Sequence, residues 1–356
     1  MTEWQRVQIY DELAHSGVEL DIINPCDYES LEQCNETIIK RLREDKTIDV
    51  FLTCLPDEYF CHGVIERISE ISIPKVLIQF DNLHAPFNNR KTAKFFDLVW
   101  LTSVETEKMF KNWGCNTVFL PYASNPYLYN DSYTKPINKV CFIGTPYGSR
   151  TQYINELLAH EVDIDVYFSK KRGTERMDNK HSLYVKGDSM IQTVFKDFTF
   201  PVGRAVLAGK LLSLLRKSSV LDEHNPHLSL RESLSFEAMN KAYSNYALSL
   251  NVTALRNTYN LKRPIQKLHL RTFEIPMSAG LELVSYSEEL AGYFSDNEMV
   301  YYNDRDEMID KVRFYTNENH STLCRQMKLN ARKRALEEHT WTLRFFKVFR
   351  KLGFKL

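Results

Sequence analysis

Hydrophobic residues recur with a helical period at the start of the chain and then gather in short runs. Trp4, Val7, Tyr10 and Leu13 lie three residues apart, which predicts a helix over residues 3–16. The same reasoning predicts helices at 28–44, 62–71 and 104–113, and strands at 18–23, 48–52, 75–80, 98–102 and 117–120. Alternating helices and short apolar strands are typical of βαβ units with a parallel sheet. Because such a domain normally begins with a strand, we expect this half to lack an opening strand of roughly five residues.

A second alternating half follows a connector rich in Tyr, Asn and Pro. Strands are predicted at 139–143, 163–168, 246–251, 281–286 and 299–302, and helices at 151–160, 205–218, 236–243, 304–316 and 321–338. Residues 169–235 otherwise show no regular pattern. The predicted division is an N-terminal domain at 1–125, a linker at 126–138, a C-terminal domain at 139–340 and a final helix at 341–356. Two such halves place a cleft between them, where ligands commonly bind.

The composition is typical of a globular protein and argues against several classes of function. Apolar residues make up 43% of the 356 residues, which suffices for two hydrophobic cores. Lys plus Arg and Asp plus Glu both number 46, so nothing favours nucleic acid as a partner. The cysteines form no CxxC pair and no metal-ligand spacing, as expected for reduced thiols in the cytoplasm. No apolar run approaches the ~18 residues that are needed to span a bilayer.

The segment 268–280 is the first candidate for chemistry. It is predicted to be a loop that leads into a short helix, with Arg271, Thr272 and Glu274 in the first turn. A helix N-terminus beside an arginine suits a diphosphate, because free N–H groups and the positive end of the dipole converge there. A carboxylate one turn further can accept hydrogen bonds from the two hydroxyls of a ribose. The alternative is a plain helix–strand connection with a surface Arg–Glu pair.

Loops that leave predicted strands supply the remaining candidates, since ligands of open α/β sheets bind at the carboxyl ends of strands. Gly144 lets a phosphate approach the backbone closely, and Arg150 is a second cation, with a solvated surface arginine as the alternative. Asn251 begins the loop that leads to the segment 268–280 and is a candidate nucleotide contact. Asp81 and His84 can orient or deprotonate a hydroxyl, with an Asx turn and a surface histidine as the alternative.

Three passages that together span nearly the whole chain resemble the CgeB-like group of GT-B glycosyltransferases. The first is 80–82 with 96–99 and 120–123, the second is 140–147 with Arg150, and the third is 270–280, followed by 289–290, 302–304 and 338–341. The resemblance implies an α/β fold of two Rossmann-like domains that face each other across a cleft, with a C-terminal helix that crosses back to the first domain. It also implies that the C-terminal domain binds a nucleotide-diphosphate sugar and the N-terminal domain binds the acceptor.

The resemblance assigns roles to single residues. Glu274 matches the ribose-binding glutamate of the family, and Arg271 would then lie near the diphosphate. Related retaining enzymes carry another glutamate eight positions earlier, where this chain has Gln266. Glu282, eight positions later, falls in a predicted strand and is interpreted as a coincidence of spacing. Enzymes of this type generally work without a bound metal, so no metal site is expected, and the acidic pair in 163–165 is assigned an edge or surface role.

The predicted function is therefore a glycosyltransferase, retaining and metal-independent, with the nucleotide sugar as donor and no further cofactor. The acceptor is expected to be a cell-surface glycan or its lipid-linked precursor, which implies a cytoplasmic enzyme of cell-envelope polysaccharide biosynthesis. The alternatives are a non-catalytic surface or spore-coat protein on the same fold, and a sugar-nucleotide epimerase. The basic, aromatic tail at 341–356 is expected to pack on the first domain; for it, and for 202–218, the alternative is contact with the anionic inner membrane surface.

Overall fold

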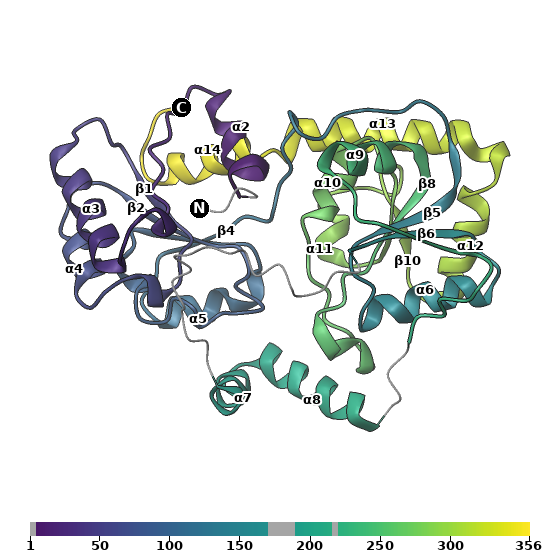
Figure 1. Ribbon diagram of the computed structural model, residues 1–356, viewed down its shortest axis with the longest axis horizontal. Coiled ribbons are helices and arrows are strands. Elements are labelled where there is room, and N and C mark those ends of the chain that lie inside the picture. Colours follow the sequence, from purple (N-terminus) through teal and green to yellow (C-terminus); the bar gives the residue numbers. More distant parts are fainter. Residues whose placement is uncertain (1–4, 170–188, 216–219) are drawn as a thin grey trace. The chain divides into compact units, whose positions relative to one another are not determined.

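The computed structural model describes residues 5–169, 189–215 and 220–356, and this part of the chain divides into two α/β units (Figure 1). The first unit holds residues 5–122, 189–196 and 342–356, and the second holds 123–169, 197–215 and 220–341. Each unit is built around its own parallel sheet, as the alternating pattern predicts. Within the described ranges, no helix combines the length and the apolar character needed to cross a bilayer.

The first unit contains a four-stranded parallel sheet in the order β1-β2-β3-β4. The strands are β1 (Phe51–Thr53), β2 (Lys75–Gln79), β3 (Leu98–Leu101) and β4 (Thr117–Phe119). The helices are α2 (Asp11–Ala14), α3 (Leu31–Glu44), α4 (Val64–Ser69), α5 (Glu107–Asn112) and α14 (Trp341–Lys351), which joins this unit from Thr342 onward. Each of these strands overlaps the run predicted for it.

The two faces of this sheet are covered by different helices. Leu77 and Val99 point to one face, where they share a core with apolar residues of α3, α4 and α5. Trp100 points to the other face, where its ring meets Phe345 of α14 edge-on at 5.1 Å. Figure 1 shows α14 beside α2, and Tyr10 just before α2 also contacts Phe345. The prediction that the C-terminal helix returns to the first domain is confirmed.

The beginning of the chain differs from the sequence-based prediction in two respects. The helix over 3–16 is interrupted: Arg6–Tyr10 form a π-helical turn, and α2 follows directly. Residues 18–23 do not form a strand. This segment is partly exposed, its Ile22 is exposed, and Asp21 forms an ion pair with Arg41 of α3. An apolar run in the sequence is thus not sufficient to form a strand here.

The second unit contains a six-stranded parallel sheet in the order β10-β9-β8-β5-β6-β7. The strands are β5 (Ile137–Ile143), β6 (Ile164–Tyr167), β7 (Leu228–Arg231), β8 (Tyr246–Asn251), β9 (Glu282–Ser285) and β10 (Val300–Tyr302). The helices are α6 (Ser149–Ala159), α8 (Pro201–Leu215), α9 (Phe236–Asn245), α10 (Arg271–Met277), α11 (Glu288–Ala291), α12 (Arg305–Tyr315) and α13 (Ser321–Glu338). The chain leaves β5 toward β6 and β7, and then returns to β8 and proceeds the opposite way.

The segment between β6 and β7 contains more structure than its irregular pattern suggested. A helix that was not predicted, α7 (Met190–Phe198), precedes α8; its residues up to 196 are assigned to the first unit and the last two to the second. The short strand β7 was also not predicted, because its four residues alternate Leu with Ser and Arg and leave only a brief signal. Residues 170–188 and 216–219 lie outside the described part of the chain.

The predicted linker is hydrogen-bonded to the second unit over much of its length. The backbone N–H of Asn130 donates to Oδ1 of Asn240 at 3.0 Å, and the N–H of Thr134 donates to Oδ1 of Asn245 at 3.0 Å. Both acceptors lie on α9. The connection is therefore held along a helix, and β5 begins at Ile137, within the range 126–138 that the sequence suggested for the linker.

Candidate functional site

The central strands of the second sheet, β5 and β8, meet where the direction of chain progression reverses. In open α/β sheets, ligands bind outside the carboxyl ends of the strands at such a switch point. Gly144 follows β5 with φ +144°, a conformation that side chains rarely permit. A Cβ atom built on Gly144 would lie 2.5 Å from Nη2 of Arg271. The guanidinium of Arg271 therefore lies directly against the backbone of Gly144, and the fold brings these two predicted residues together.

Arg150 lies close enough to Arg271 to feel its charge, and it is half-buried. Its Nη1 donates to the carbonyl oxygen of Thr145 at 3.1 Å, and its guanidinium lies 4.8 Å from the centre of the Tyr147 ring. Burial lowers the pKa of Arg150, and repulsion from the nearby charge of Arg271 lowers it further. Within the described part of the chain, neither arginine forms an ion pair with a carboxylate. Two like charges held together in this way favour a polyanionic ligand.

Two helices, α6 and α10, begin near these arginines, and their first turns differ in how the backbone N–H groups are hydrogen-bonded. The first turn of α6 follows Gly148 and has no side-chain cap among the described residues, although the N–H of Arg150 in this turn donates to the carbonyl oxygen of Tyr147 at 3.2 Å. At α10, by contrast, the N–H groups of Thr272, Phe273 and Glu274 donate to carbonyls of the preceding turn. The expectation of free N–H groups at the start of α10 is therefore wrong, because the loop before it is already helical.

Glu274 lies inside the protein, not on its surface. Its side chain is only 6% exposed, and its carboxylate accepts a hydrogen bond from Tyr129. Burial raises the pKa of Glu274, while the positive charge of Arg271 and the Tyr129 hydrogen bond act in the opposite direction. The alternative of a surface Arg–Glu pair is therefore wrong. Glu274 is held one turn along the helix from the arginine, by partners that favour its charged form.

Asn251 and Thr272 are buried behind this site. Nδ2 of Asn251 lies 3.3 Å from Oγ1 of Thr272 and donates to Oε1 of Glu282 at 2.7 Å. This network joins the end of β8, the start of α10 and the start of β9, so it fixes the helix that carries Arg271. In this structure, Asn251 and Thr272 therefore hold the start of α10, and with it Arg271, in position.

Glu282 is a part of this network that sequence reasoning missed. Its side chain is fully buried, its second carboxylate oxygen has no hydrogen-bond partner among the described residues, and burial raises its pKa to about 8. It also interacts with the charges of Arg271 and Glu274. Both acids therefore interact with the charge of Arg271. The sequence did contain a signal for this buried role: Glu282 begins an apolar strand, where burial of an unpaired charge costs free energy.

The stability of the protein is expected to depend on the protonation of Glu282. Because its folded pKa lies above the unfolded value of 4.5, the folded state holds a proton that the unfolded state releases between these pH values. The free energy of unfolding should fall as pH rises from 4.5 to 8, by up to about 1.4 kcal/mol per pH unit. Glu282→Gln should remove this component in urea denaturation measured from pH 5 to 8. The exposed control Glu288→Gln should leave it; an unchanged slope in Glu282→Gln would refute the assignment.

Asp81 and His84 lie together in the first unit, just after β2. The N–H of His84 donates to the carbonyl oxygen of Asp81 at 2.9 Å, and the Tyr122 hydroxyl donates to Oδ1 of Asp81 at 3.3 Å. The neighbouring Asn82 is buried and joins this loop to the loop after β3 through Thr102 and Ser103. Asp81 is exposed on this anchored loop. Its role and that of His84 in catalysis remain predictions.

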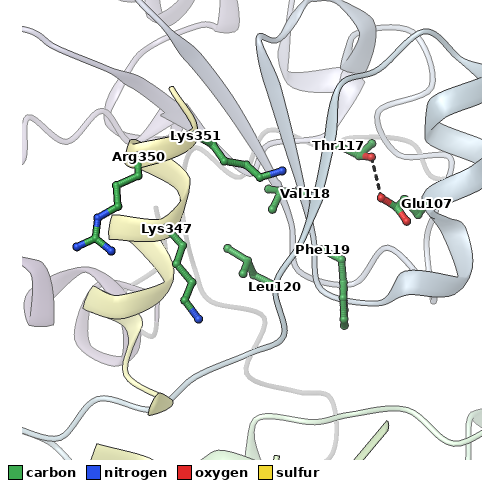
Figure 2. Close-up of a pocket in the computed structure, with 8 residues that line it drawn as sticks. All are labelled: Glu107, Thr117, Val118, Phe119, Leu120, Lys347, Arg350 and Lys351. Atoms are coloured by element: carbon green, nitrogen blue, oxygen red, sulfur yellow. Dashed lines mark hydrogen bonds between the residues drawn. The ribbon is translucent and has the colours of Figure 1, made fainter. Parts of the chain in front are cut away.

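A groove of about 580 Å³ lies elsewhere in the first unit, between β4 and α14 (Figure 2). Val118 and Leu120 line one wall, and Lys347 and Lys351 extend from α14 on the other (Figure 2). Glu107 at its edge is bound by Lys111 at 2.9 Å and by Thr117 at 3.1 Å. None of the residues that sequence analysis assigned to the site lines this groove.

The acidic pair in 163–165 has a structural role. Asp163 lies 2.9 Å from the ring of His227, and Asp165 is buried and accepts hydrogen bonds from Arg231 and Tyr246. The predicted edge or surface role is wrong for Asp165, because β6 lies between β5 and β7. Among the described residues, no group of three or more His, Cys, Asp or Glu side chains is arranged to hold a metal ion.

Comparisons with known proteins give a family match and several similar folds. The family described as glycosyl transferase-like matches residues 190–349. The structure of HepE from Anabaena in complex with UDP-glucose has 11% identity and a TM-score of 0.53, covering 97% of this chain and 88% of that one. Sucrose-phosphate synthase from Thermosynechococcus elongatus has 11% identity and a TM-score of 0.50, with 96% and 91% covered. A glycosyltransferase from Rickettsia africae has 10% identity and a TM-score of 0.52, with 96% and 86% covered.

These matches confirm the predicted fold class and enzyme class. No curated protein matches this chain by sequence. The structural similarities are at low identity and so establish the fold, in which two Rossmann-like units each contain a parallel sheet. The family match runs from α7 into α14, which continues to Lys351, and includes Arg271 and Glu274. The chain is thus a glycosyltransferase of the GT-B fold, and its residues 190–349 match the glycosyl transferase-like family.

Proposed function

We propose that this protein transfers a sugar from a nucleotide-diphosphate donor bound at the Gly144 loop of the second unit. The observation that carries the proposal is the position of Arg271 against the backbone of Gly144, at the switch point of the sheet, with Arg150 close enough to feel its charge. A diphosphate supplies the negative charge that would compensate both guanidinium groups. The first turn of α6 provides backbone N–H donors for the same phosphates.

These groups suit the chemistry of sugar transfer. When the bond between sugar and diphosphate breaks, negative charge develops on the oxygens of the departing phosphate. Fixed guanidinium groups stabilise that charge more in the transition state than in the bound donor, which is the requirement for catalysis. Since both arginines are half-buried, their interaction with the phosphates is less weakened by solvent than at an open surface.

Glu274 is proposed to bind the ribose of the donor. Its carboxylate is oriented by Tyr129 and lies near Arg271, so ribose and diphosphate would bind along one turn of α10. A carboxylate that accepts a hydrogen bond from a ribose hydroxyl should discriminate against a sugar that lacks it.

Glu274→Ala is therefore expected to weaken binding of the ribose-containing nucleotide by about 30-fold. Calorimetric titration with a nucleoside diphosphate and with its 2′-deoxy analogue separates this role from a structural one. The wild-type protein should prefer the ribose form, and the variant should bind both forms about equally. A variant that keeps the full preference would exclude Glu274 from the ribose site, even if its overall affinity falls.

The nucleotide and the sugar are the next questions. The HepE structure contains UDP-glucose, so UDP-sugars are the first donors to test with this chain. A screen should measure both the thermal shift and the release of nucleoside diphosphate from UDP-, GDP-, ADP- and dTDP-sugars. We expect at least one donor to give both a shift and turnover once an acceptor is supplied.

The acceptor is proposed to be a cell-surface glycan or a lipid-linked precursor, bound by the first unit. Asp81 and His84 would orient or deprotonate its hydroxyl, because both follow β2 on a loop that Asn82 anchors. We further propose a retaining, metal-independent reaction that needs no additional cofactor. The enzyme would act in the cytoplasm, with peripheral contact at the inner face of the membrane, in cell-envelope polysaccharide biosynthesis.

Two rival functions are separated from this one by the donor screen. A non-catalytic protein on the same fold would bind a nucleotide but release no product from any donor. A sugar-nucleotide epimerase would convert the sugar while leaving its bond to the diphosphate intact. Gln266, which accepts a hydrogen bond from Thr253 at 2.7 Å, is the departure from related enzymes that makes this comparison necessary.

A further inference from the structure

The groove between β4 and α14 is formed by residues of the first unit alone (Figure 2). β4 is the last strand of the four-stranded sheet, so its outer edge pairs with no described strand. Four consecutive residues, 117–120, line the groove along that edge. Its volume of about 580 Å³ lies within the range of ~300–1,000 Å³ that is typical of small-molecule sites. The groove can therefore hold a ligand without any contribution from the second unit.

Three cations of α14 line the other side of this groove. Lys347, Arg350 and Lys351 lie three and four positions apart, so they share one face of the helix. All three side chains are exposed, and no described Asp or Glu forms an ion pair with any of them. Nη2 of Arg350 donates to the carbonyl oxygen of Leu356 at 3.4 Å. A bound anion would therefore meet concentrated and largely uncompensated positive charge.

Glu107, the acidic residue that lines the groove, is already bound by other groups. Its Oε1 lies 2.9 Å from Nζ of Lys111 and accepts a hydrogen bond from Oγ1 of Thr117 at 3.1 Å. The hydrogen bond from Lys111 is the largest cause of the lowered pKa of Glu107, and the charge of Lys351 contributes least. Three cations and one carboxylate line the groove, so its net charge is positive even without Lys111.

Buried contacts fix both walls of the groove. Arg344 is buried on α14, and its Nε donates to the carbonyl oxygen of Pro121, just after β4, at 3.2 Å. On the strand side, the N–H of Leu120 donates to the carbonyl oxygen of Leu101 at 3.0 Å, and Nε1 of Trp100 donates to that of Leu120 at 2.8 Å. The groove is therefore formed before any ligand binds, which lowers the entropic cost of binding.

The strand side of the groove is apolar. Val118 and Leu120 point toward α14 (Figure 2). An inorganic anion would use the cations and leave these side chains in contact with water, whereas an anion attached to an apolar chain would cover them. An added peptide strand fits less well, because β4 has only three residues with which it could pair. The two walls together favour an anionic amphiphile.

Two segments were sequence-based candidates for contact with an anionic membrane, 202–218 and the tail 341–356. The described part of 202–218 buries Val206 and exposes Leu211 and Leu214, so it packs in a core on one side only. The tail packs its apolar residues in the first unit, as expected, and its cations line the groove. Core packing and contact with an anionic lipid are therefore compatible in the tail, because they use different sides of α14.

We infer that the groove between β4 and α14 binds the headgroup of an anionic membrane lipid. The lipid phosphate would lie among Lys347, Arg350 and Lys351, and the first part of an acyl chain would contact Val118 and Leu120. This site would provide the peripheral membrane contact proposed above. It does not depend on nucleotide binding, because none of its residues belongs to the donor site.

Calorimetric titration of the full-length protein with soluble lipids tests this inference. Dihexanoyl phosphatidic acid, used below its micelle-forming concentration, has both the phosphate and the apolar chains. The wild-type protein should bind it at least about tenfold more tightly than glycerol 3-phosphate, which has no chain, and than dihexanoyl phosphatidylcholine, which has no net charge. If either of these two compounds binds as tightly as phosphatidic acid, one wall of the groove has no role and the inference is wrong.

Removal of the three cations should abolish most of this binding. The triple variant Lys347→Gln, Arg350→Gln, Lys351→Gln is expected to bind dihexanoyl phosphatidic acid at least about 30-fold more weakly than the wild-type protein. Because these positions are exposed and glutamine maintains helix propensity, the variant should fold. Thermal denaturation checks its stability before the titration.

A matched control removes the same number of cations from elsewhere in the first unit. Lys40→Gln, Arg43→Gln, Lys46→Gln changes exposed residues of α3 and the turn after it, and α3 covers the opposite face of the sheet from α14. This variant should bind the lipid as the wild-type protein does. An equal loss of affinity in the two triple variants would show that net charge alone, and not the groove, attracts the lipid.

Vesicle flotation and nucleotide titration complete the test. The wild-type protein should bind vesicles of phosphatidylcholine with phosphatidic acid, and the groove variant should bind them at least about tenfold more weakly. A groove that binds polyglutamate but no vesicle would be a peptide site, contrary to the inference. The groove variant should bind a nucleoside diphosphate normally, and Arg150→Ala with Arg271→Ala should leave lipid binding unchanged. Loss of lipid binding in that double variant would place the lipid at the donor site and overturn the inference, whereas failure of lipid binding alone leaves the donor site standing.

Discussion

An Arg271→Ala variant is expected to bind nucleoside diphosphates about 100-fold more weakly than the wild-type protein. The guanidinium lies against Gly144 and repels Arg150, and an anion that binds beside them relieves this repulsion. Charge-assisted hydrogen bonds to phosphate in a partly buried site typically have effects of this size. Isothermal titration calorimetry of the purified variant measures the loss directly.

Two further substitutions make this result specific. Arg271→Lys keeps a positive charge but not the planar pair of donors, and should recover part of the affinity, leaving a loss of about tenfold. Arg305→Ala removes an arginine of the same unit that is half-exposed and paired with Glu156, and should leave affinity unchanged. If Arg271→Ala and Arg305→Ala bind the nucleotide equally well, Arg271 is not a phosphate ligand.

The second large effect is expected from Gly144→Ala, which should weaken nucleotide binding by at least about tenfold. The new methyl group would lie 2.5 Å from Nη2 of Arg271, so the guanidinium would have to move away from the loop. The φ of +144° adds backbone strain, which costs roughly 1 kcal/mol of stability or more. Thermal denaturation and calorimetric titration separate the two effects.

Gly114→Ala is the matched control for this substitution. Gly114 also has a positive φ, +84°, but a Cβ there would meet nothing within 4 Å. Both variants should lose stability through backbone strain, and only Gly144→Ala should lose nucleotide affinity. Equal nucleotide affinity in the two variants would indicate that the contact between Gly144 and Arg271 has no part in binding.

Periodicity alone was sufficient to predict the elements that position the site. The strands β5 and β8 fall within two residues of their expected ranges, because each has a strong apolar run with a clear end, and α10 lies inside the segment 268–280 where a short helix was expected. The pairing of Arg271 with Glu274 was also accessible, since three-residue spacing in a helix places side chains on one face. The resemblance to GT-B enzymes then assigned both residues to one nucleotide-binding site.

Other features depend on contacts that spacing does not reveal. Glu282 was set aside because it falls in a predicted strand, yet it accepts a hydrogen bond from Asn251 and interacts with the charge of Arg271. The amides of α10 were expected to be free, but Leu270 already has a helical conformation and its carbonyl accepts two of them. Helix α7 was missed although Ile191, Val194, Phe195 and Phe198 have helical spacing, because the helix is short and lies in a segment that was interpreted as irregular.

The most direct test of the central claim compares a nucleoside diphosphate with the matching monophosphate in the same calorimetric titration. If Arg150 and Arg271 bind the diphosphate, the wild-type protein should prefer the diphosphate by at least about 30-fold, whichever base it selects. The double variant Arg150→Ala, Arg271→Ala should reduce that preference to about threefold or less. A wild-type protein that binds the monophosphate as tightly as the diphosphate would contradict the account.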